Sequence, residues 1–237
     1  MAISLEKFNI KTLNVFILGF GFFLSQFYIF SSGLPQPAHI FIIFSFFIFS
    51  FFHDKIKITD TKLLIFFVAY AILINIFYTL LRDDLSYIIS TVYWIFNLIF
   101  FLVLLNLNFV NIQKIFHYLR FIIPFSLIVN TVIWIVGAGR YDFNPRYNGY
   151  FNDPNQMAFW VLCSCAIGLI LYKNFKYKIF IYSISLFLIL LTMSRSATIG
   201  FLILTLGLIF QHRSRLNIKI IFSLLSLVLA VVLFFIL

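Results

Sequence analysis

The chain has 237 residues, of which 63% are hydrophobic and 10% are charged, and its formal net charge is +10. A soluble domain has roughly 45–50% apolar and about 25% charged residues, so this chain has too little polar surface for a water-soluble fold. Apolar runs long enough to cross about 30 Å of hydrocarbon recur along the sequence. The composition therefore predicts an integral membrane protein.

Nine apolar segments are predicted to cross the membrane as helices, because backbone groups in hydrocarbon must be satisfied inside the segment itself. They are Leu13 to Ser31, Pro35 to Phe52, Leu63 to Leu81, Ser86 to Asn106, Ile115 to Gly137, Gln156 to Tyr172, Ile179 to Met193, Arg195 to Phe210 and Ile220 to Leu237. We expect one polytopic all-α membrane domain over residues 1–237, with residues 138–155 as an outer loop. The first segment is about 19 residues long, beyond the roughly 7–15 of a signal-peptide core, and is expected to remain as an anchor.

Lysine and arginine residues predict the orientation. With the N-terminus in the cytoplasm, thirteen of the 17 cations fall in inner segments and four fall outside, in agreement with the positive-inside rule. The outer four are Arg82, Arg140, Arg146 and Arg195. A net charge of +10 spread over short inner segments needs no nucleic-acid partner, since a nucleic-acid surface would gather its cations on one face.

The cysteines and histidines do not form a metal-binding pattern. Cys163 and Cys165 are two residues apart on a predicted helix and point about 200° apart, so they can neither bridge each other nor share a metal. The histidines stand near segment ends with no second ligand at helical spacing. We expect neither a metal nor a cofactor.

The loop before the sixth segment combines capping residues with an arginine that capping does not explain. Asp153 is placed as a helix N-cap and Pro154 as the first helical residue. Arg146 has two interpretations. It is either a loop arginine in contact with solvent and lipid headgroups, or a ligand-binding group.

Arg195 is predicted to lie below the outer membrane surface. The helix from Lys178 to Arg195 would be about 25 Å long, and that from Arg195 to Gln211 about 24 Å. Both are shorter than the roughly 30 Å of hydrocarbon, and an arginine at such depth faces a protein interior or a water-filled cavity. The alternative is that Lys178 reaches back to the inner surface or that the bilayer thins locally.

The predicted topology brings these two arginines together. The sixth and eighth segments both begin at the outer face, so their N-termini point to the region of Arg146 and Arg195. Helix N-termini and arginine side chains both favour phosphate-like anions. An outward cavity of this kind among membrane helices indicates a lipid-diphosphate substrate.

Two motifs resemble signatures of the O-antigen polymerase and O-antigen ligase superfamily. The segment from Arg146 to Asn155, RYNGYFNDPN, is similar to the family pattern R..G.F..PN. The segment from Leu191 to Gly200, LTMSRSATIG, is similar to the pattern LT.SR.A..G. The resemblance covers about residues 140–237, whereas the first half of the chain matches in topology.

The resemblance implies an all-helical, GT-C-like glycosyltransferase of the bacterial cytoplasmic (inner) membrane that uses no metal. Such enzymes polymerise or ligate oligosaccharide units of O antigen or capsule, carried on undecaprenyl diphosphate, at the outer face. Other polysaccharide-assembly membrane proteins are implied as partners. Arg146 and Arg195 would be catalytic. The implied substrate-site residues, some of which shape the loop, are Gly149, Asn152, Asp153, Asn155 and Ser194.

The chain departs from this family after its ninth segment, where members continue with a large outer loop and further spans. The resemblance therefore implies a member that is incomplete at its C-terminus, and no general base is identified. Two other classes stay open: a transporter, such as a flippase for lipid-linked oligosaccharides, and a noncatalytic membrane protein.

Overall fold

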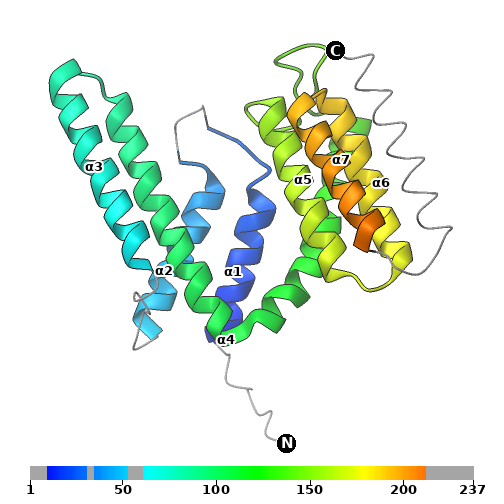
Figure 1. Ribbon diagram of the computed structural model, residues 1–237, viewed down its shortest axis with the longest axis horizontal. Helices are drawn as coiled ribbons and strands as arrows, with labels where there is room; N and C mark the ends of the chain where they lie inside the picture. Colours follow the sequence, from blue (N-terminus) through cyan, green and yellow to red (C-terminus); the bar gives the residue numbers. More distant parts are fainter. Residues whose placement is uncertain (1–9, 31–34, 53–60, 212–237) are drawn as a thin grey trace, which may run out of the picture. The chain divides into compact units, whose positions relative to one another are not determined.

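The computed structural model describes residues 10–30, 35–52 and 61–211, and these residues form an all-helical structure (Figure 1). The helices are α1 (Ile10–Leu24), α2 (Pro37–Phe52), α3 (Lys62–Arg82), α4 (Ser86–Ile135), α5 (Pro154–Leu171), α6 (Phe175–Thr192) and α7 (Arg195–Gln211). Two isolated β-bridges occur in the loop before α5, and no β-strand occurs among the described residues. The all-α class is confirmed for this part of the chain.

Five helical segments are long and apolar enough to cross a membrane. They are α3, two parts of α4 (Ser86–Leu105 and Gln113–Ile135), α5 and α6. Shorter apolar stretches form α1, α2 and α7. Eight of the nine predicted spans therefore overlap helices, and five of these helical segments are long enough to cross a membrane. The ninth predicted span, Ile220 to Leu237, lies outside the described residues. These apolar helices are those of a multi-pass membrane protein.

The first helix is shorter than predicted. It ends at Leu24, whereas the sequence predicts a span to Ser31. Beyond its end, the side chain of Gln36 accepts hydrogen bonds from the backbone N–H groups of Ile29 and Phe30 at 3.0 and 3.1 Å and donates to the carbonyl of Phe30 at 3.0 Å. A polar side chain thus satisfies backbone groups that would otherwise need a helix.

The fourth and fifth predicted spans form one continuous helix. The sequence predicts a break between Asn106 and Ile115, but α4 is a single helix of 50 residues that includes this stretch. The intervening residues include neither glycine nor proline, so no helix-stop residue is present there. Pro124, which lacks an N–H donor, lies further along within the helix.

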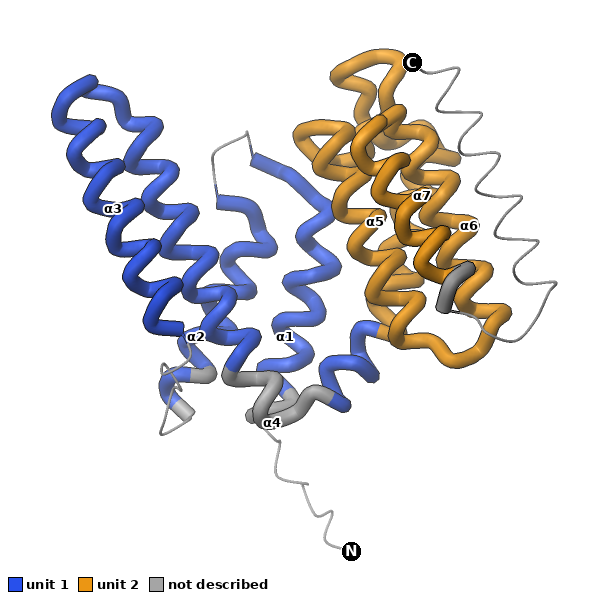
Figure 2. The backbone as a smooth tube through the Cα atoms, in the orientation of Figure 1, with its two compact units in different colours: residues 1–119 blue, residues 120–237 orange. Residues whose placement is uncertain are grey.

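The chain divides into two compact units, residues 1–119 and 120–237, and α4 passes from one into the other (Figure 2). In the first unit α1 packs on α2, and the buried hydroxyl of Ser45 on α2 donates to Oδ1 of the buried Asn14 on α1. Val15 and Val103 form an apolar centre in this unit. Helix α3 buries Val68 and exposes large apolar side chains along its length, including Leu63, Phe66 and Leu80.

The second unit has a more continuous core. Helix α5 packs against both α6 and α7, with Val161, Leu188 and Phe201 fully buried. The hydroxyl groups of Tyr182 and Thr205 share a hydrogen bond of 2.7 Å between α6 and α7. A Cβ atom added at Gly200 would lie 2.7 Å from Cδ2 of Leu162, so a larger residue there would require the end of the Leu162 side chain to move. This packing fixes the end of the unit where the two predicted motifs lie.

Candidate functional site

The two motif segments predicted from the sequence contact each other at one end of the second unit. The backbone N–H of Tyr147 donates to the carbonyl of Leu191 at 3.0 Å, and Nε of Arg146 donates to the carbonyl of Thr192 at 3.0 Å. Thr192 is the last residue of α6, and α7 begins three residues later at Arg195. The loop between α4 and α5 is therefore hydrogen-bonded to the junction of α6 and α7.

The buried amide of Asn148 organises the loop. Its Nδ2 donates to Oδ2 of Asp142 at 2.9 Å and to the carbonyl of Phe151 at 2.7 Å, while its Oδ1 accepts from the backbone N–H of Asp142 at 3.3 Å. The backbones of Arg140 and Gly149 pair beside it, with Arg140 N–H donating to Gly149 at 2.8 Å. Gly149 has φ +58°, a left-handed conformation that favours glycine.

Two aromatic side chains anchor the same loop in the protein. Tyr147 and Phe151 are each 1% exposed, and Phe151 lies 5.9 Å from the ring of Trp160 on α5. Burial raises the pKa of the Tyr147 phenol well above its ordinary value, and the neighbouring Tyr141 and Tyr150 raise it further. Tyr147 therefore stays protonated at neutral pH and does not act as a base.

Arg146 links three parts of the unit through its half-buried side chain. In addition to the bond with Thr192, its Nη2 donates to Oδ1 of Asn155 at 2.8 Å. Asn155 is the second residue of α5, so one guanidinium connects the loop, the end of α6 and the start of α5. These bonds use two of the five N–H donors of the guanidinium and orient its plane.

The start of α5 is built as the sequence predicts. Asp153 is the N-cap, its Oδ1 accepts from the N–H of Asn155 at 2.6 Å, and Pro154 occupies the first turn. The Asp153 carboxylate is thus engaged in capping, as the Asp142 carboxylate is engaged with Asn148. Both carboxylates of this loop shape the backbone.

The start of α7 is held by hydroxyl groups. Ser194 is 1% exposed, and its N–H donates to Oγ1 of Thr192 at 3.3 Å. The carbonyl of Ser194 accepts from both the N–H and Oγ1 of Thr198, at 3.0 and 2.8 Å. Arg195 follows as the first residue of α7 and is exposed.

The helix ends at this end of the unit carry partial charges of opposite sign. Arg146 binds the carbonyl end of α6, where a cation is favoured, whereas Arg195 stands at the N-terminus of α7, where a cation is disfavoured by about 0.3–1 kcal/mol. The N-terminus of α5 adds a second partial positive charge at Pro154 and Asn155. Both arginines and the N-termini of α5 and α7 place positive charge at this end of the unit, whereas the carbonyl end of α6 and the Asp153 carboxylate place negative charge there.

The predicted site residues differ in their contacts and in their burial. Arg146 and Asn155 are bonded to each other, and Arg195 is exposed at the start of α7. Gly149 and Ser194 are buried, and their contacts shape the backbone. The half-buried Asn152 and Asp153 precede α5.

Sequence reasoning did not single out Tyr147, Asn148 or Thr192. Asn148 and Tyr147 hold the loop in place, and the carbonyl of Thr192 orients Arg146. All three lie inside the two motifs, and Thr192 matches the threonine of the pattern LT.SR.A..G. Nothing in the sequence, however, shows that a backbone carbonyl is the partner of a side chain.

The described residues contain no group of three or more histidine, cysteine, aspartate or glutamate residues that could hold a metal ion. Cys163 and Cys165 are both free thiols. No family model matches the chain, and neither any curated protein nor any solved structure matches it.

Proposed function

We propose that this protein is a glycosyltransferase of bacterial surface-polysaccharide assembly, which polymerises or ligates oligosaccharides carried on undecaprenyl diphosphate. The observation that carries the proposal is the contact between the segments 146–155 and 191–200, in which Arg146 binds Thr192 and Asn155. Two sequence motifs far apart in the chain are joined by one guanidinium. A shared ligand site explains why both carry an arginine.

The chemistry needed from these residues is stabilisation of a departing diphosphate. The acceptor hydroxyl oxygen bonds to the anomeric carbon, the bond from that carbon to the diphosphate oxygen breaks, and the hydroxyl proton is released. Negative charge grows on the diphosphate as it leaves. Preoriented cations and helix N-termini stabilise such charge more than water does, and removal of one such donor typically lowers turnover by about 10²–10³-fold.

The membrane orientation belongs to the same proposal. We place the N-terminus in the cytoplasm and the loop 138–155 at the outer face of the bacterial cytoplasmic membrane, because thirteen of the 17 cations then lie inside. The test is cysteine labelling after Cys163 and Cys165 have been replaced by serine. A membrane-impermeant maleimide should label Tyr141→Cys on intact cells and Lys173→Cys only after lysis. The reverse pattern would overturn the orientation.

The function is tested by gene deletion and complementation, with surface polysaccharide resolved on gels. Arg146→Ala and Arg195→Ala should fail to restore long chains. Arg140→Ala is the matched control, because Arg140 is an exposed arginine of the same loop whose guanidinium lies 6.0 Å from the ring of Tyr150. It should complement. All variants are compared at equal amounts of the protein in the membrane.

The outcomes separate this proposal from its alternatives. Long chains lost with single repeat units still displayed outside support a polymerase, and loss of all transfer to the acceptor supports a ligase. Repeat units that accumulate at the inner face indicate a flippase and would overturn the proposal. Full complementation by both arginine variants would do the same.

A further inference from the structure

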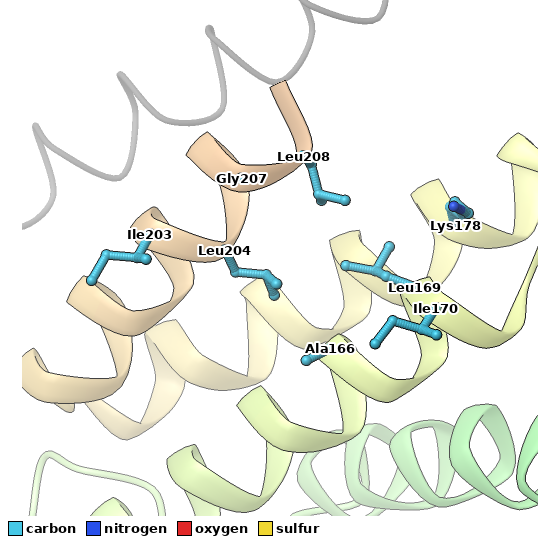
Figure 3. A pocket seen from close by; sticks show the side chains of 8 residues that line it. All are labelled: Ala166, Leu169, Ile170, Lys178, Ile203, Leu204, Gly207 and Leu208. Carbon is cyan, nitrogen blue, oxygen red and sulfur yellow. The ribbon is translucent and has the colours of Figure 1, made fainter. Parts of the chain in front are cut away.

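Helices α5, α6 and α7 line an open groove of about 650 Å³ (Figure 3). Lys178 is its charged lining residue, and the others are apolar or small. They are Ala166, Leu169 and Ile170 of α5 and Ile203, Leu204, Gly207 and Leu208 of α7. The volume lies within the roughly 300–1,000 Å³ of sites that bind small molecules.

The groove lies at the end of the unit opposite to Arg146. Lys178 is in the first turn of α6, fourteen residues before Thr192, which is about 21 Å along the helix. The rings of Tyr172 and Tyr177 stack at this end with centroids 5.3 Å apart. Tyrosine and lysine together at a helix end are typical of the boundary between hydrocarbon and water.

Charge restricts what this groove can accept. The half-buried Lys178 lines it, and Lys173 and Lys176 are exposed at the same end. Residues 154–211 contain no aspartate and no glutamate. The lining therefore matches an occupant that is apolar along the groove and negatively charged at the end near Lys178.

We propose that this groove binds one acyl chain of an anionic phospholipid, whose phosphate pairs with Lys178. A lysine ammonium acts as a point charge for phosphate, and basic pockets between membrane helices hold anionic headgroups. The phosphate position at Lys178 is separate from the arginine site, since Lys178 lies about 21 Å along α6 from the end that Arg146 contacts.

Two substitutions test the two halves of the site. Lys178→Gln removes the charge, and Lys176→Gln is its matched control, because Lys176 is exposed two residues away and does not line the groove. Gly207→Leu fills the groove, since a Cβ atom there meets nothing within 4 Å and leucine also favours helix. Gly207→Ala, which adds one methyl group, is the control for size.

The measurement is native mass spectrometry of the purified full chain in detergent with phosphatidylglycerol or phosphatidylcholine of identical acyl chains. The wild type should retain phosphatidylglycerol preferentially. Lys178→Gln should reduce that preference about fivefold, while Lys176→Gln should change it less than about twofold. Gly207→Leu should lower retention of phosphatidylglycerol at least as much as Lys178→Gln, and Gly207→Ala should leave it near the wild-type value.

Equal retention of the two lipids by the wild type would overturn the proposal, as would wild-type retention by both Lys178→Gln and Gly207→Leu. A dimer that Gly207→Leu dissociates would show that a second copy fills the groove. A cross-link from position 207 to residues 220–237 would show that the chain itself fills it. Either result would also overturn the proposal. Activity of the variants is not part of the readout, so failure here leaves the arginine site untouched.

Discussion

The two units of this protein differ in how much of their helices they bury. In the most apolar 18-residue stretch of each helix, 50% of the residues of α5 and 39% of those of α6 are buried. The corresponding share is 6% in α3 and 6% in the first part of α4. The less buried helices are the more apolar ones, with mean hydropathy 2.4 for α3 and 1.5 for α5. In a membrane, lipid tails are as apolar as leucine, so high apolarity marks contact with lipid rather than burial in protein.

The candidate site belongs to the better packed unit. A binding group must be held within about 0.5 Å of its working position, which requires a supporting shell of packed side chains and hydrogen bonds. Arg146 has that shell, because Thr192 and Asn155 hold its guanidinium and the buried Tyr147 follows it in the chain. No comparable set of polar contacts occurs along the described part of α3.

Two leucine-to-alanine substitutions, one in each unit, should differ most in their effect on stability. Leu188→Ala on α6 removes a side chain with 0% exposure and leaves a cavity, which costs about 2–5 kcal/mol in protein cores. The loss for Leu188→Ala should lie at the lower end of this range, because the unfolded helix exposes the side chain to lipid rather than to water. Leu80→Ala on α3, where the side chain is 80% exposed, should cost less than about 0.5 kcal/mol. Thermal unfolding of the full chain in detergent measures both. Equal losses would contradict the assignment of α3 as a lipid-facing helix.

A pair of asparagines gives a smaller effect. Asn148→Ala leaves the carbonyl of Phe151 and the carboxylate of Asp142 without their amide donor, which should cost about 1–3 kcal/mol. Asn75→Ala on α3 removes an amide whose Nδ2 has no hydrogen-bond partner among the described residues, so it should be close to neutral. Limited proteolysis of the loop 138–153 is a second readout. An Asn148→Ala protein with a protected loop and unchanged melting temperature would disprove the role given to this amide.

The sequence predicted features that depend on local chemistry. Asp153 and Pro154 identify the start of α5 because capping needs those residue types at adjacent positions. Alternation of helices along the chain brings the N-termini of α5 and α7 to one end. The non-helical course of Ile29 and Phe30 after α1 could not be predicted in this way, because their backbone N–H groups bind the side chain of Gln36.

The contacts that support the candidate site could not be predicted from the sequence either. Arg146 binds a backbone carbonyl 46 residues away, and any residue at position 192 supplies that group. The groove beside Lys178 is lined by residues of three helices, and a Cβ atom at one of them, Gly207, would meet no other atom within 4 Å. Both depend on how α5, α6 and α7 pack, and the nearly uniform apolarity of these helices hides their inward faces.

The smallest expected effect concerns an exposed turn in the first unit. Asp84 accepts from the backbone N–H of Ser86 at 2.9 Å, and this bond lowers the pKa of the Asp84 carboxyl below its ordinary value of 3.8. Its contribution is therefore present above pH 3.8 and is lost as the pH falls through the lower folded-state pKa. Asp84→Asn should melt slightly below the wild type at pH 6, and the difference should shrink at pH 3. A difference that grows in acid would contradict this sign.

Reconstitution tests whether Arg146 and Arg195 hold a lipid diphosphate. The purified chain in liposomes is given the lipid-linked oligosaccharide extracted from the deletion strain, and released undecaprenyl diphosphate is measured. The wild type should release it, Arg140→Ala should match the wild type, and Arg146→Ala should be slower by about 10²-fold or more. Release by Arg146→Ala and Arg195→Ala at the wild-type rate would contradict the account.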